Sequence, residues 1–188
     1  MSIPRWNPSV EPSKQETLLL KRCAKKRKLF VFLREHRHEI FNEALQDELG
    51  SMYRNTGAGR EPVAPALMAM GLILQGCHGV SDAEAVELSV VDLRWQMVLD
   101  RLGETAPAFS QGALFDFRER LIASELNRRL LEHTANLARS TEGFDWKKLP
   151  KTLRIAIDSS PLAVAGRGKT LSISLVMLPA MWFVASQS

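Results

Sequence analysis

The sequence predicts a mainly α-helical protein in which a helical bundle is followed by one β-strand. Apolar residues recur every three or four positions over most of residues 16–140, and helix-capping residues precede several of these runs. Only "TLRIAID", residues 152–158, alternates as a strand does. Because one strand does not form a sheet by itself, we expect residues 152–167 to begin a second, incomplete unit.

Residues 1–15 contain three prolines and little apolar content, which is typical of an extended or flexible arm. A helix is expected from about Ser13 to His36. Its inner side would hold Leu18, Leu19, Phe30 and Leu33. A second helix is indicated by Phe41, Leu45, Leu49 and Met52. The apolar stretch 64–79 predicts a third, ending near Gly76 or Gly79.

Three more helices follow in the pattern. Ser81 and Glu84 form an S-x-x-E capping box, so a helix begins at Asp82 and continues to near Gly103. Ser110 and Ser124 are expected to cap the next two. The residues expected to face inward are Ala85, Leu88, Val91, Trp95, Leu99, Leu114, Phe117, Leu121, Leu126, Leu130 or Leu131, and Leu137. Residues 141–151 are expected to be a linker, so the helical domain would span 16–140.

The charge is distributed unevenly along the chain. The net charge is +4, but residues 1–37 carry ten Lys and Arg against three Glu, and the rest of the chain is net negative. A basic block of this kind indicates an acidic partner such as nucleic acid, although a solvated helix face gives the same pattern. Two cysteines without metal-site spacing, and an N-terminus without an apolar core, favour a reduced, cytoplasmic protein.

"IAIDSSPL" raises the question of what Asp158 does. An aspartate at the end of a buried strand can bind a metal ion, but it can equally cap the strand and bond to the turn at Ser159 and Ser160. Residue pattern alone favours the capping role.

Four segments together resemble the transposases of bacterial insertion sequences, and more narrowly those with an InsH-type N-terminal helical domain before a DDE core. The segments are "FLREHRHEIF", "APALMAMGLILQGCHGVSDAEAVELSVVDLRWQMVLD", "FSQGALFDFRERLI" and "LRIAIDSSPLAVAGR", within residues 28–167. The resemblance implies an RNase H-like core in which two Asp and one Glu hold two Mg²⁺ ions for attack on phosphodiesters. Asp158 matches the first of these carboxylates, as a catalytic residue and metal ligand.

The resemblance stops after Asp158. The second Asp and the Glu would lie far downstream, and no charged residue follows Lys169. One permitted back-translation of residues 172–187, read from its third base, gives a peptide that resembles the family's next segment. We therefore expect residues 168–188 to be a frameshifted tail on a truncated core, without stably bound Mg²⁺. A C-terminal membrane anchor is the alternative reading of this uncharged tail; serines and Pro179 weaken it, so no membrane association is expected.

The implied function is binding of the element's terminal inverted repeats by the helical domain, without catalysis by this chain. The expected phosphate contacts are Lys21, Arg22, Lys25, Lys26, Arg27, Lys28, Arg34 and Arg37. A helix-turn-helix-like pair at 81–102 and 110–122 would add Gln111, Arg118 and Arg120; the same periodicity equally fits a bundle that only supports the core. The alternatives are a non-enzymatic inhibitor that binds DNA or intact transposase, and an inert pseudogene product. The partners considered besides DNA are a second copy of the chain, in a homo-oligomer, and intact transposase.

Overall fold

The computed structural model describes residues 3–53 and 62–141, and these residues form helices and loops without a β-strand. The predicted linker, the strand at 152–158 and the tail lie outside the described residues. The helices are α1 (Lys14–Cys23), α2 (Lys28–Ile40), α3 (Glu43–Ser51), α4 (Pro65–His78), α5 (Asp82–Val91), α6 (Leu93–Val98), α7 (Gln111–Ala123) and α8 (Leu126–Ser140). The prediction of a mainly helical protein is confirmed for this part of the chain.

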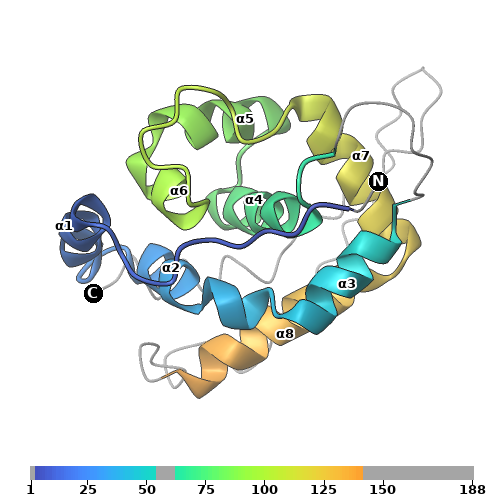
Figure 1. Cartoon of the computed structure of the whole chain (residues 1–188), viewed down its shortest axis with the longest axis horizontal. Helices are drawn as coiled ribbons and strands as arrows, with labels where there is room; N and C mark the ends of the chain where they lie inside the picture. Colours follow the sequence, from blue (N-terminus) through green and yellow to red (C-terminus); the bar gives the residue numbers. More distant parts are fainter. Residues whose placement is uncertain (1–2, 54–61, 142–188) are drawn as a thin grey trace.

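Helix α4 lies in the middle of the bundle and is buried on all sides (Figure 1). Every residue from Pro65 to Leu74 is buried, because α3, α5 and α7 all pack against α4. Pro65 starts the helix, and Gly79 ends it with a φ of 63°, in the left-handed region that glycine adopts without strain. The predicted apolar helix at 64–79 is therefore confirmed.

The expectation of one helix from Ser13 to His36 is wrong. The chain turns at residues 24–27, between α1 and α2. Leu18 and Leu29 are eleven residues apart, which is about three turns of an α-helix, so one straight helix would point both side chains the same way. Leu18 is exposed and Leu29 is buried. The turn allows α2 to bury its own apolar face, and it places Leu18 on the outside rather than inside as expected.

The expected long helix after Ser81 is likewise two helices. Its start is confirmed: the capping box forms, with Ser81 Oγ accepting from Glu84 N–H and Glu84 accepting from Ser81 N–H. The helix ends at Asp92, whose extended backbone and side chain cap α6. Val91 therefore points to solvent, whereas Trp95 and Leu99 are fully buried.

Of the two serines expected to cap the last two helices, one does so and the other does not. Ser110 accepts a hydrogen bond from Ala113 N–H at 3.2 Å and caps α7, as expected. Ser124 instead ends α7, and its hydroxyl donates to Leu121 O. Glu125, with a φ of 58°, precedes α8 without a side-chain cap. Helix α8 packs across α2 and α7, burying Leu130, Thr134 and Ala138.

Candidate nucleic-acid interface

Residues 3–13 are an extended segment held against the bundle (Figure 1, dark blue). Trp6 is buried and packs edge-on against Phe41, with 5.6 Å between ring centroids. Trp6 and Gln46 exchange two hydrogen bonds: Trp6 N–H donates to Gln46 Oε1 at 2.9 Å, and Gln46 Nε2 donates to Trp6 O at 3.1 Å. Arg5 forms an ion pair with Asp47. The segment expected to be a flexible arm is thus anchored to α3.

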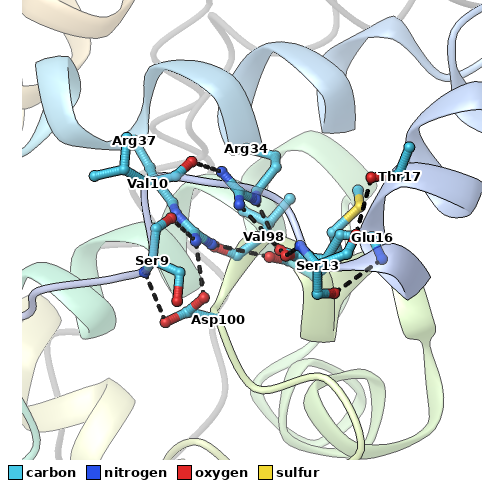
Figure 2. A network of polar contacts seen from close by, with 10 residues as sticks. Ser9, Val10, Ser13, Glu16, Thr17, Arg34, Arg37, Val98 and Asp100 are labelled. Carbon is cyan, nitrogen blue, oxygen red and sulfur yellow. Dashed lines mark hydrogen bonds and ion pairs between the residues drawn. The ribbon is translucent and has the colours of Figure 1, made fainter.

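Arg37 joins the same segment to α2 and α6 (Figure 2). Its side chain is completely buried, and its Nη2 donates to Ser9 O at 2.6 Å and to Asp100 Oδ1 at 2.8 Å. Its Nη1 donates to the carbonyls of Met97 and Val98, at 3.0 and 3.2 Å. Burial lowers the pKa of Arg37, but the guanidinium stays charged at any ordinary pH. Arg37 is therefore an internal brace, and its guanidinium is unavailable to phosphate.

Arg34 is also buried and joins α1 to α2 (Figure 2). Its Nε donates to Glu16 Oε1 at 2.7 Å, and its Nη1 donates to Val10 O at 3.2 Å. Glu16 also accepts from Ser13 N–H in the capping box of α1. Burial raises the pKa of Glu16, but the hydrogen bonds from Arg34 and Ser13 outweigh it and leave that pKa below its usual value. This pair fixes α1 upon α2.

The other six expected phosphate contacts lie together at the end of α1 and in the α1–α2 turn. Five of them are exposed and one, Lys28, is partly buried. The six residues, which we call the basic turn, are Lys21, Arg22, Lys25, Lys26, Arg27 and Lys28. None forms an ion pair with a carboxylate in the part of the chain that the structure describes. Six neighbouring cations without a carboxylate ion pair among the described residues make a site suited to a polyanion.

Three further residues of α1 are exposed although the sequence pattern did not suggest them as contacts, and one of them, Leu18, was expected on the inner side. They are Lys14, Gln15 and Leu18, and Leu18 keeps 59% of its surface exposed. At 100° per residue, Leu18 shares one side of the helix with Lys21 and Arg22, three and four positions later. The buried Glu16 and Cys23 lie on the opposite side. The signal in the sequence was this spacing of Leu18 to the two cations.

The three candidates on α7 differ from the basic turn. Gln111 is exposed. Arg118 donates to Asp82 and to Gln75, at 2.5 and 3.0 Å from its Nη2, and ties α7 to α5 and α4. Arg120 lies over the ring of Tyr53, 4.6 Å from its centroid. The structure therefore does not bring the α7 cations together with the basic turn.

Asp158, the expected catalytic residue and metal ligand, lies outside the described residues. Within residues 3–53 and 62–141, no group of three or more His, Cys, Asp and Glu side chains could hold a metal ion. None of the helices in these ranges is long and apolar enough to cross a membrane.

The helical bundle and its exposed cations define a small helical domain of a type suited to binding a polyanion. Residues 20–120, more than half of the chain, match the family described as Transposase domain (DUF772). The chain belongs to this transposase domain family. Comparisons with curated proteins and with solved structures gave no match.

Proposed function

We propose that this chain binds duplex DNA as the N-terminal helical domain of an insertion-sequence transposase, with the terminal inverted repeats of its element as the target. The observation that carries the proposal is the basic turn, because its cations have no carboxylate partners among the described residues. Counterion release from DNA then supplies the free energy of binding. Membership of the transposase domain family supports DNA as the polyanion.

The proposal uses a smaller contact set than the sequence suggested. Arg34 and Arg37 are excluded from the phosphate contacts because their guanidiniums already donate hydrogen bonds inside the fold. The acceptors are Glu16, Asp100 and backbone carbonyls. Exposing either group to phosphate would leave these buried partners unsatisfied, at a cost of about 1–3 kcal/mol for each group. The phosphate contacts are therefore assigned to the basic turn.

The proposal includes no strand transfer by this chain. Mg²⁺ would supply the activation of a water or a DNA 3′-hydroxyl in a complete DDE core. Asp158 alone cannot hold the pair of ions that this chemistry uses. We accordingly expect Asp158→Ala to leave DNA affinity unchanged, and a marked loss of affinity would count against this division of roles.

The test is a salt titration of binding. The full chain is titrated into a fluorescent 30-base-pair duplex of mixed sequence, by anisotropy, between low and moderate salt. Lys25→Ala/Lys26→Ala should weaken binding and reduce the slope of log K against log salt by about 2, since each phosphate contact contributes about 0.9. The matched control is Arg128→Ala/Arg129→Ala on α8, which removes the same charge from side chains paired with Glu132 and Glu48.

Equal losses in the two double variants would mean that net charge alone drives binding, and would remove the basic turn as a site. Absence of duplex binding by the unaltered chain would overturn the proposed function itself.

A further inference from the structure

We infer that α1 is the helix that enters the major groove and reads base edges with its exposed side, which includes Lys21 and Arg22, while residues 25–28 of the basic turn bind the phosphates. This inference rests on the proposed function and adds the element that carries sequence preference. It replaces α7, the helix that the sequence pattern suggested for that role.

The solvent-facing side of α1 has one consistent chemical character. Its exposed residues are Lys14, Gln15, Leu18, Lys21 and Arg22. At 100° per residue these five fall within an arc of about 120° on the helix surface. Glu16 is the only acidic residue of α1, and it is buried on the far side against Arg34. The exposed arc therefore carries three cations, one amide and one large apolar side chain, with no carboxylate to repel DNA.

These side chains are the types that read base edges. An Arg or Lys side chain hydrogen-bonds the acceptors of guanine, and a Gln amide donates to and accepts from adenine. An apolar side chain contacts the methyl group of thymine. Leu18 lies between Gln15 and Arg22 along the same side of the helix, so one groove could meet all three. This also accounts for a leucine that is 59% exposed on a helix whose exposed surface is otherwise charged or polar.

The position of α1 in the fold leaves this side open. It lies at the edge of the described bundle, and its other side packs against α2 and α6 (Figure 1). The major groove is about 12 Å wide and admits one α-helix. The Ser13–Glu16 capping box and the Glu16–Arg34 ion pair hold α1 at both its start and its buried side (Figure 2). A rigidly held, peripheral helix is what base readout needs.

The exposed side of helix α7 differs from that of α1 because it carries carboxylates. Phe115, Asp116, Glu119 and Arg120 are exposed on α7; neither carboxylate has an ion-pair partner among the described residues, and Arg120 lies over the ring of Tyr53. Arg118 is engaged by Asp82 and Gln75. Two free carboxylates one turn apart would repel the phosphates on either side of a groove. The charge of the exposed surface thus favours α1 over α7.

The test is a selection from random DNA. The full chain is incubated with duplexes that carry a randomised 15-base-pair centre, and bound molecules are enriched and sequenced. The unaltered chain should enrich a short motif. In the Gln15→Ala/Leu18→Ala variant, the enrichment of the preferred bases over the other bases should fall tenfold or more. Loss of one good base contact costs about that factor in discrimination. The affinity of this double variant for a fixed duplex of unrelated sequence should change less than threefold, since no cation is removed.

Two further variants keep the result interpretable. The matched control is Gln111→Ala/Phe115→Ala, which changes one exposed amide and one exposed apolar residue on α7 and should keep the motif. Lys25→Ala/Lys26→Ala should weaken binding to all sequences alike. Far-ultraviolet circular dichroism and thermal melting check that each variant is folded; the altered α1 side chains are exposed, so little destabilisation is expected.

The outcomes separate the two claims. A motif that survives in the α1 variant, or that is lost in the α7 variant, overturns the inference. Duplex binding with no enriched motif also overturns it; it leaves standing the binding of duplex DNA by the basic turn, but not the choice of terminal inverted repeats as the target. No duplex binding by the unaltered chain overturns both.

Discussion

Arg34 and Glu16 form a buried ion pair between α2 and α1, with 2.7 Å between Arg34 Nε and Glu16 Oε1 (Figure 2). Both side chains are less than 10% exposed. The pair connects the inner side of α1 to the bundle, and the same helix leads into the basic turn. The proposed DNA contacts therefore depend on a carboxylate that touches no DNA.

Glu16→Gln should weaken DNA binding although it makes the chain more positive. The amide leaves the Arg34 guanidinium buried beside a neutral partner, which should lower the free energy of unfolding by about 3 kcal/mol. With α1 less firmly held, affinity for duplex DNA should fall severalfold. Urea denaturation and anisotropy titrations of the same samples measure the two effects.

The control for Glu16→Gln is Glu11→Gln, which makes the same charge change at an exposed residue of the N-terminal segment. It should leave stability within about 0.5 kcal/mol of the unaltered chain and bind DNA equally well or slightly more tightly. If Glu16→Gln also bound more tightly, simple electrostatics would explain the site and the positioning role of Glu16 would be wrong.

Arg37→Met should be among the most damaging single substitutions in the described part of the chain. It removes the donors to Ser9 O, Met97 O and Val98 O and leaves Asp100 without its ion-pair partner. Losing a buried, multiply bonded cation should cost about 3–5 kcal/mol. Thermal melting should show a large fall in Tm. Arg5→Met, which breaks the exposed ion pair with Asp47, should cost less than about 1 kcal/mol; comparable losses would refute the assignment of Arg37 as an internal brace.

Acid should destabilise the bundle. Burial raises the pKa of Glu16 and of Asp82, but hydrogen bonds, chiefly from Arg34 and Arg118, outweigh burial, so both pKa values are lower in the folded chain than their ordinary 4.5 and 3.8. The unfolded chain then binds more protons, so these groups contribute stability that is complete above their ordinary pKa values and is lost as the pH falls through the folded ones. Tm should therefore fall steeply as the pH drops below about 4.5.

The role of Glu16 in the acid transition is tested by comparing the pH dependence of Tm in the Glu16→Gln variant and in the unaltered chain. The variant has one fewer carboxyl group with a lowered pKa, so its Tm should fall less steeply between pH 4.5 and pH 3 than that of the unaltered chain. Identical slopes would mean that Glu16 does not contribute to the acid transition.

Substitution of two glycines by alanine should change the stability of the chain in opposite directions. A Cβ at Gly71 in α4 would lie 2.6 Å from Cε1 of the Phe109 ring, so Gly71→Ala must displace that buried ring and should cost about 1–3 kcal/mol. A Cβ at Gly112 in α7 meets no atom within 4 Å, so Gly112→Ala should stabilise the chain by about 0.5–1 kcal/mol through helix propensity. Urea denaturation of the two variants side by side checks this pair of signs.

The sequence determined several of the features that depend on neighbours within one helical turn, although the cap expected at Ser124 was wrong. The capping box at Ser81 and Glu84 and the cap at Ser110 were predicted correctly because each bond closes over three residues. The apolar helix α4 was predicted from its composition alone. The exposed cations at residues 21–27 were also apparent, since such charged side chains remain in solvent unless a partner buries them.

Only the tertiary structure decided which arginines are buried and paired inside the fold. Arg34 and Arg37 differ little from Arg22 or Arg27 in local sequence, but their partners Glu16 and Asp100 lie 18 and 63 residues away. The break between α1 and α2 has the same origin, because the burial of Leu29 by the bundle conflicts with the exposure of Leu18 in a single helix. Short-range periodicity does not contain these distant partners, and burial of a charge is determined by them.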